Sequence, residues 1–230
     1  MTRPRMIGAL AAGTAALLWC AHGSAQEAAS PHEMHRRHRD PRAYMAALDD
    51  PARDDYQMPG AVVRALGLRE GEVVADIGSG TGYFTVRFAR AVGEGGRVYA
   101  VDISPEMVRH LNRRLRDADI RNVVTVLAEP DDPLLFADSV DRVVIVNTWH
   151  HIGDQPAYLE KLKRVLRPGG QVVHIDFQKR DTPVGPPTSE KIARGDLVAQ
   201  MEGSGFRLAA EHDFLPYQYF LVFELPAPGP

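Results

Sequence analysis

The sequence predicts an α/β fold, in which a mostly parallel sheet has helices on both of its faces. Apolar, strand-like runs alternate with helical stretches between residues 56 and 177. The first run leads into a glycine-rich turn and then a helix, as in a βαβ unit. After residue 205 the pattern changes to two consecutive strands joined by a turn at Pro216. Alternating strands and helices give a parallel sheet covered on both faces, and the last two strands extend it as an antiparallel pair.

Local signals delimit these elements. Pro59 suits the first turn of a helix, because the first helical position needs no N–H donor. Ser104 with Pro105, and Asp154, are typical residues at the start of a helix, and Gly93 is typical of a helix end. The predicted helices are 56–66, 83–91, 105–116, 155–166 and 191–202, and the predicted strands are 72–77, 98–102, 123–127, 140–146, 171–177, 206–214 and 218–225.

The glycine-rich turn has the sequence Asp76-Ile77-Gly78-Ser79-Gly80-Thr81-Gly82, and the next strand ends in Asp102. Glycine has no Cβ, so such a turn adopts backbone angles closed to other residues and lets a ligand lie against bare backbone. A carboxylate at the tip of the second strand can accept hydrogen bonds from both hydroxyls of a ribose. Together these features indicate a nucleoside-binding unit.

The glycine spacing distinguishes two classes of ligand. Dinucleotide sites use G-x-G-x-x-G, whereas this turn reads D-x-G-x-G-x-G and resembles motif I of the class I S-adenosylmethionine-dependent methyltransferases. Arg167-Pro168-Gly169-Gly170 is similar to a turn of the same family, as is the terminal strand pair. The resemblance covers residues 56–225. It implies a Rossmann-like class I methyltransferase fold with a seven-stranded sheet, S-adenosylmethionine as cofactor, and a small-molecule methyl acceptor as in the ubiquinone-biosynthesis-like (type 11) group.

The resemblance also implies roles for single residues. Asp76 helps to organise the methionine end of the cofactor, Asp102 holds the ribose, and Ile103 packs on the adenine. After the third strand the family pattern is broken, so Glu129 is expected at the adenine edge, with Asp131 as the alternative. The expected cofactor-binding residues are Asp76, Gly78, Gly80, Gly82, Asp102, Ile103, Glu129 and Asn147.

The segment Asn147-Thr148-Trp149-His150-His151 follows the fourth strand and should border the reacting methyl group, because ligands bind at the carboxyl ends of the strands in such sheets. His150 or His151 could serve as general base, since imidazole titrates near neutral pH. The alternative is that both histidines only position the loop. A sulfonium is already a strong methyl donor, so holding the acceptor in line can supply most of the rate.

Composition excludes some classes of function. The chain has 230 residues, of which 44% are hydrophobic and 25% charged, and its formal net charge is −3. These values are typical of a globular domain with a full core and give no reason to expect nucleic-acid binding. Cys20 is the only cysteine, so a chain processed after residue 25 would contain no disulfide or cysteine-bound metal.

The N-terminus has the pattern of a secretory signal peptide. Arg3 and Arg5 precede the apolar run 7–20, and small residues lead to Ala25. We therefore expect a signal peptide at 1–25, a polar linker or arm at 26–50 and a methyltransferase domain at 51–230, with an exported, periplasmic or secreted protein and no membrane span after cleavage. A retained N-terminal anchor is the alternative.

The predicted linker contains His32 and His35, which would share a face if the segment were helical. A solvated tail is the simpler interpretation, and we expect no metal site. Two other functions compete with methyl transfer. One is an exported binding protein that keeps the fold without turnover, because S-adenosylmethionine is made in the cytosol. The other is a nicotinamide oxidoreductase, which the glycine spacing disfavours. The oligomeric state is left open.

Overall fold

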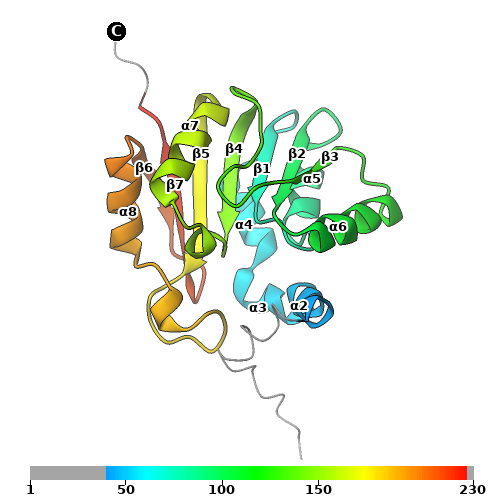
Figure 1. Cartoon of the computed structure of the whole chain (residues 1–230), viewed down its shortest axis with the longest axis horizontal. Helices are drawn as coiled ribbons and strands as arrows, with labels where there is room; N and C mark the ends of the chain where they lie inside the picture. The colour runs from blue at the N-terminus through cyan, green and yellow to red at the C-terminus, as the bar shows by residue number, and fades with distance from the viewer. Residues whose placement is uncertain (1–39, 227–230) are drawn as a thin grey trace, which may run out of the picture.

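The computed structural model describes residues 40–226, which form a seven-stranded sheet with helices on both faces (Figure 1). The strand order is β3-β2-β1-β4-β5-β7-β6. The strands are β1 (Val73–Ile77), β2 (Arg97–Asp102), β3 (Val123–Leu127), β4 (Val140–Val146), β5 (Leu166–Phe177), β6 (Arg207–His212) and β7 (Gln218–Glu224). Strands β1 to β5 pair in parallel, and β7 is antiparallel to both β5 and β6. The predicted fold class is therefore confirmed.

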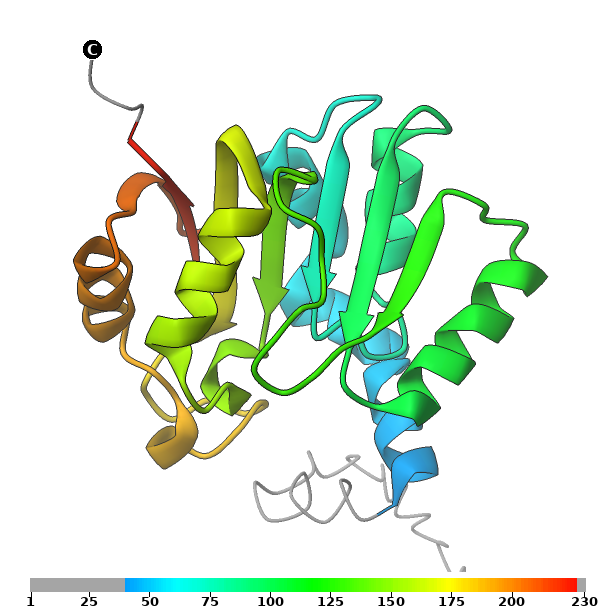
Figure 2. The ribbon, with the colours of Figure 1, turned by 45° about the horizontal axis from the view of Figure 1, so that its top comes forward.

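Helices form a layer on each face of the sheet (Figure 2). They are α2 (Pro41–Leu48), α3 (Asp54–Gln57), α4 (Pro59–Leu66), α5 (Thr85–Val92), α6 (Pro105–Asp117), α7 (Gln155–Val165) and α8 (Arg194–Gly203), with single turns η1 (Pro51–Arg53), η2 (Trp149–His151) and η3 (Thr188–Glu190). The expected caps are present, since the Ser104 hydroxyl accepts from the Met107 amide and Asp154 accepts from the Ala157 amide.

The sheet separates two apolar cores. On one face Leu159 and Leu162 of α7 and Leu197 of α8 pack against inward residues of β4, β5 and β7. On the other face α4 and α5 supply Val62 and Phe88, and α6 continues this layer. Both faces of the central strands are thus buried, which explains why those strands are almost continuously apolar.

The structure differs from the sequence-based expectation near the N-terminus. Residues 41–48 of the predicted linker form α2, whose first amides donate to the Asp40 carboxylate. The single helix expected over 56–66 is divided into α3 and α4, because Met58 adopts left-handed backbone angles with φ of 42°. The rest of the predicted linker and the predicted signal peptide lie outside the described residues.

The Pro168-Gly169-Gly170 stretch is a bulge within β5 rather than a turn before it. Leu166 already pairs with Val140, and the register then shifts before Gln171 pairs with Arg142. A Cβ on Gly170 would lie 2.9 Å from the Arg167 carbonyl oxygen. The strand therefore begins five residues earlier than predicted.

One buried polar side chain in the core has an unusual environment. His174 of β5 is fully buried, and neither ring nitrogen has a hydrogen-bond partner within residues 40–226. Its ring packs edge-on against Trp149, with centroids 4.9 Å apart, and against Phe223, 6.0 Å away. Burial lowers the pKa of His174 to about 3. Stability is therefore lost as the pH falls below about 6.5, because the unfolded chain then binds a proton that the folded chain does not.

We expect His174→Leu to raise the free energy of unfolding by about 1 kcal/mol at pH 7.5, because it removes two unpaired nitrogens at similar volume. The gain should grow by about 2 kcal/mol at pH 5, where the unfolded wild-type chain is protonated. Urea unfolding at the two pH values measures both quantities. A variant that is less stable than wild type at both would show that His174 is satisfied in solution.

Candidate functional site

The predicted site residues follow strands whose carboxyl ends meet at one edge of the sheet. Figure 1 shows α2 and α3 beyond this edge, on the side toward which the arrows of the parallel strands point. The glycine loop follows β1, Asp102 ends β2, and Asn147 follows β4. Chain segments far apart in sequence are thus brought together at the carboxyl ends of the strands. This edge is the usual place for a ligand in an open α/β sheet.

The glycine loop has the backbone angles that its composition predicts. The φ angles are 72° at Gly78, 55° at Gly80 and 85° at Gly82, a region that side chains with a Cβ rarely adopt. The amides of Gly78 and Ser79 both donate to the Val101 carbonyl, at 2.8 and 3.0 Å. The loop is therefore tied to the neighbouring strand β2.

Neighbouring side chains pack closely on these glycines. A Cβ on Gly78 would lie 2.2 Å from the Thr148 hydroxyl oxygen, and one on Gly82 would lie 2.3 Å from Leu111. At Gly80 the nearest side chain is Leu48 of α2, at 3.2 Å. Part of the glycine requirement thus comes from packing within the protein, in addition to the open backbone that we expected for a ligand.

Asp102 faces the glycine loop. One carboxylate oxygen accepts from the Gly80 amide and the other from the Ser104 amide, both at 2.8 Å. Burial raises the pKa of Asp102, and the amide bonds act against this by stabilising the anion. A carboxylate oxygen can accept a second hydrogen bond, so these contacts leave capacity for ribose hydroxyls.

Asp76 lies beneath the loop and is 3% exposed. It accepts a hydrogen bond from the Thr85 hydroxyl at 2.5 Å. Burial raises the pKa of Asp76 to about 7, the Thr85 bond opposes this, and the charge of Asp102 adds to the rise. The acid that opens the motif is therefore poised to change its charge near neutral pH.

The residues expected around the adenine are at the surface. Ile103 is 59% exposed directly after Asp102. Glu129 is exposed, and its backbone pairs with that of Asp132 in a tight turn. The alternative, Asp131, lies 3.4 Å from the Lys161 amine. Glu129 is the less engaged of the two acids, so it remains our choice for this edge.

Asn147 links three strands. Its φ is 52°, which asparagine tolerates better than most residues. Its backbone N–H donates to the Ile175 carbonyl oxygen at 2.8 Å. Its side-chain oxygen accepts from the side-chain NH₂ of Gln218 at 2.7 Å. The segment after β4 thus turns sharply at Asn147 and places Thr148 against Gly78.

The structure distinguishes the two adjacent histidines. Nδ1 of His150 lies 2.9 Å from a carboxylate oxygen of Asp176, and the two side chains are 5% and 2% exposed. His151 is exposed, with its ring centroid 4.1 Å from that of His150. Asp176 did not figure among the predicted residues. Its signal in the sequence is a carboxylate near the carboxyl end of the apolar strand 171–177.

The aromatic residues near the site belong to two groups. Tyr56 of α3 lies 6.2 Å from Phe177 and 6.3 Å from Tyr217, measured between ring centroids. Trp149 and Phe220 are fully buried in the core. Tyr56 and Tyr217 are half-buried, so the first group has exposed surface that a small molecule could contact.

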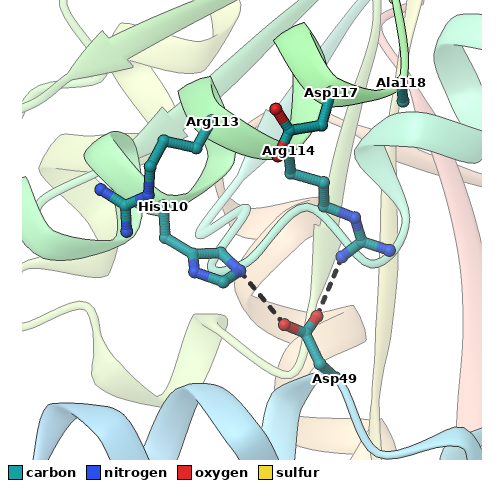
Figure 3. Close-up of a pocket in the computed structure, with 6 residues that line it drawn as sticks. All are labelled: Asp49, His110, Arg113, Arg114, Asp117 and Ala118. Carbon is teal, nitrogen blue, oxygen red and sulfur yellow. Dashed lines mark hydrogen bonds and ion pairs between the residues drawn. The ribbon is translucent and has the colours of Figure 1, made fainter.

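The end of α2 is fastened to α6 and to the glycine loop. Asp49 lies between His110, at 3.2 Å, and Arg114, at 2.9 Å (Figure 3). Arg114 also donates to the carbonyl oxygen of Thr81 within the loop, at 3.1 Å. The surface pocket at this junction is lined by Asp49, His110, Arg113, Arg114, Asp117 and Ala118.

A second contact joins the N-terminal segment to the loop through Tyr83. The guanidinium carbons of Arg53 and Arg87 lie 4.1 and 4.2 Å from the centre of its ring, which are cation–π distances. The Tyr83 hydroxyl donates to Asp54. Residues 41–57, part of which we expected to be a linker, therefore form one wall of the site.

The fold and the site together define a class I S-adenosylmethionine-dependent methyltransferase. A family model described as a methyltransferase domain matches residues 74–170. A S-adenosylmethionine-dependent methyltransferase from Aquifex aeolicus has 30% identity and a TM-score of 0.75, and the match covers 78% of this chain and 95% of that one. The chain belongs to this family, and the family implies S-adenosylmethionine as cofactor.

Two further similar proteins have names that specify a subgroup of methyltransferases. The ubiquinone/menaquinone biosynthesis C-methyltransferase UbiE of Klebsiella pneumoniae is 33% identical over 155 residues, which are 63% of this chain and 60% of that protein. A putative type 11 methyltransferase from Sulfolobus solfataricus is 25% identical, with a TM-score of 0.56 over 68% of this chain and 86% of that one. The chain thus spans about 60% of the length of the curated relative.

The described residues show neither a membrane-spanning helix nor a metal-binding cluster. Within residues 40–226 no helix has the length and apolar character needed to cross a membrane. The same residues contain no cluster of three or more histidine, cysteine or acidic side chains placed to hold a metal ion. His32 and His35 lie outside this range.

We expect the affinity for S-adenosylmethionine to increase by up to about tenfold between pH 6 and pH 8, because Asp76 loses its proton in this range and an anion attracts the cationic cofactor. Calorimetry at the two pH values measures the change. Asp76→Asn is the matched control, since it cannot ionise while the ligand titrates as before. An equal pH response in both proteins would exclude Asp76 as its source.

Proposed function

We propose that this chain transfers the methyl group of S-adenosylmethionine to a small-molecule acceptor. The observation that carries the proposal is the Asp102 carboxylate, which is held at 2.8 Å from the Gly80 amide at the mouth of the glycine loop. When bound, the cofactor supplies an electrophilic methyl group on a positively charged sulfur. The protein has to hold the cofactor, orient the acceptor and keep both in line.

The residues around the loop suit that ligand. Asp102 would accept hydrogen bonds from the ribose, and exposed Ile103 would pack on the adenine with Glu129 at its edge. Gly78, Gly80 and Gly82 would border the amino-acid end of the cofactor above Asp76. Asn147 would border the methyl group. These roles extend the family resemblance to this chain residue by residue.

The acceptor is proposed only as a class. The name of the curated relative describes C-methylation in quinone biosynthesis, which supports a small molecule as acceptor. A net charge of −3 supports this too, because it gives no general attraction for nucleic acid. Calorimetry with S-adenosylmethionine, followed by transfer of a labelled methyl group to a panel of acceptors, tests the proposal. Binding without transfer to any acceptor would favour the non-catalytic alternative.

We also propose that the protein is exported, with a signal peptide removed after Ala25. The basic start, the apolar run of 7–20 and the small residues before Ala25 support this.

Replacing Asp102 tests the assignment of the ribose site. Asp102→Ala should weaken S-adenosylmethionine binding by about 1–3 kcal/mol, because buried polar groups lose their partner. Calorimetry gives the affinity, and circular dichroism shows whether the variant is folded. Glu202→Ala, which removes an exposed acid on α8, should bind like wild type. A folded Asp102→Ala protein with unchanged affinity would exclude the ribose assignment.

The N-terminus of the mature protein tests export. Mass spectrometry of the protein from its native cell, separated into periplasmic, secreted and cytosolic fractions, should find a chain that begins at Gln26 outside the cytosol. A chain that still begins at Met1 and remains with the membrane would instead support an anchor.

A further inference from the structure

The pair formed by His150 and Asp176 differs from a surface ion pair because it is buried and because both carboxylate oxygens are engaged. Asp176 uses both carboxylate oxygens, one accepting from the Phe177 amide at 2.8 Å and the other lying 2.9 Å from His150 Nδ1. Its side chain is 2% exposed, and that of His150 is 5% exposed. A carboxylate held at two points in a buried position fixes the ring beside it.

The hydrogen bond determines which ring nitrogen carries the proton. An ionised carboxylate only accepts hydrogen bonds, so Nδ1 of the neutral imidazole must donate to Asp176. The lone pair then lies on Nε2, which has no hydrogen-bond partner within residues 40–226. A ring in this state is ready to accept a proton, and Asp176 would stabilise the imidazolium that forms.

Other charged and titratable groups face this pair from the surrounding elements. The ring of His151, also in η2, lies beside that of His150 with the two planes tilted by 49°. Tyr219 of β7 lies opposite Asp176 in the sheet register, and its hydroxyl is buried without a partner among the described residues. Burial lowers the pKa of the Lys191 amine, and the charge of Asp176 acts against this. The amine itself donates to the Arg180 carbonyl at 2.8 Å and the Thr182 hydroxyl at 2.6 Å. Among the described residues, His150 is therefore the side chain that bonds to the Asp176 carboxylate.

The pair lies where the transferred methyl group is expected. His150 comes two residues after Thr148, whose side chain packs on Gly78 of the cofactor loop. Asp176 is at the carboxyl end of β5, beside the segment after β4. Phe177, the next residue, points to the other face of β5, where its ring belongs to the aromatic group with Tyr56 and Tyr217. An acceptor held beside the glycine loop at the carboxyl ends of β4 and β5 would approach the histidine from this edge of the sheet.

We propose that Asp176 is a positioning residue that holds His150 with Nε2 as general base, and that the acceptor is a protic nucleophile. This rests on the proposed methyl transfer. The acceptor would be a hydroxyl, an amine or an acidified C–H group whose proton must leave as the new bond forms. Its electron pair attacks the methyl carbon, the carbon–sulfur bond breaks with its pair left on sulfur, and the acceptor proton passes to Nε2 and then to water. Neutral thioethers and tertiary amines have no such proton and lie outside this class.

The first test needs no acceptor. Long-range proton–nitrogen NMR spectra of the ¹⁵N-labelled protein, with His150→Gln used for assignment, should show the His150 proton on Nδ1, in slow exchange with water. Asp176→Asn should remove this slowly exchanging proton. Glu202→Gln is the control, because it removes an exposed carboxylate on α8 away from the site, and it should leave the His150 signals unchanged. A proton on Nε2 in wild type, or no change in Asp176→Asn, would overturn the positioning role.

The second test uses S-adenosylmethionine with a labelled methyl group and two sets of probes, a phenol and a primary amine against a thioether and a tertiary amine. Wild type should methylate a protic probe. His150→Gln should lower kcat about 100-fold at pH 7, and Asp176→Asn at least tenfold, with the KM for the cofactor changed less than twofold. With the phenol, the rate of both variants should recover as the pH rises, because an ionised phenol needs no base.

The outcomes separate the two proposals. Failure to bind S-adenosylmethionine contradicts the proposed function, and the NMR result then decides on the positioning role by itself. Cofactor binding with transfer to aprotic probes alone overturns the protic class. Cofactor binding without transfer to any probe contradicts the proposed methyl transfer, and the NMR result again decides on the positioning role by itself. Variants with wild-type kcat at pH 7 overturn the base. A loss of kcat that is the same at every pH indicates a structural role for the pair and also counts against it.

Discussion

The backbone amides of the glycine loop are hydrogen-bonded to the end of β2, and the other parts of the site are arranged around this contact. Gly78 and Ser79 donate to one carbonyl oxygen of β2, and Asp102 at its tip accepts from Gly80. These bonds require β1 and β2 to be parallel neighbours that end at the same level, as they are. They also bring the loop so close to the segment after β4 that Thr148 occupies the space of a Gly78 side chain. A change in the loop would therefore disturb three strands together.

Much of the fold could be predicted because its signals are local. Apolar runs, helix caps and glycines act over a few residues, so the strands 123–127 and 140–146 were predicted with their observed limits. The positive φ angles of Gly78, Gly80 and Gly82 follow from the motif in the same way. The bulge in β5 was missed because Pro168-Gly169-Gly170 has the same local pattern whether it ends a helix or interrupts a strand.

The parts that could not be predicted depend on contacts between distant residues. Helix α2 is a short apolar stretch within the predicted linker. It is held in place by Asp49 with Arg114 and by Leu48 over Gly80. Nothing near His150 and His151 in the sequence indicates which of them turns inward. The answer comes from Asp176 at the end of β5, 26 residues away. Sequence spacing alone could suggest a histidine at the site, whereas its hydrogen-bond partner and its tautomer depend on the arrangement of the sheet.

Three acids near the carboxyl ends of the strands, two buried and one half-buried, give the site its electrostatic character. Asp76, Asp102 and Asp176 lie at or next to the ends of three strands. A hydroxyl donates to Asp76 and two backbone amides donate to Asp102. A backbone amide and an imidazole bond to Asp176. Burial raises the pKa values of both Asp76 and Tyr44, and the charge of Asp102 adds to the rise, so an ionised Asp102 disfavours ionisation of Asp76. A bound cation relieves this repulsion. Because methyl transfer turns the sulfonium into a neutral thioether, the attraction on sulfur is lost as the reaction proceeds. In the proposed reaction, carboxylates that attract the cofactor would therefore hold the neutral product less strongly.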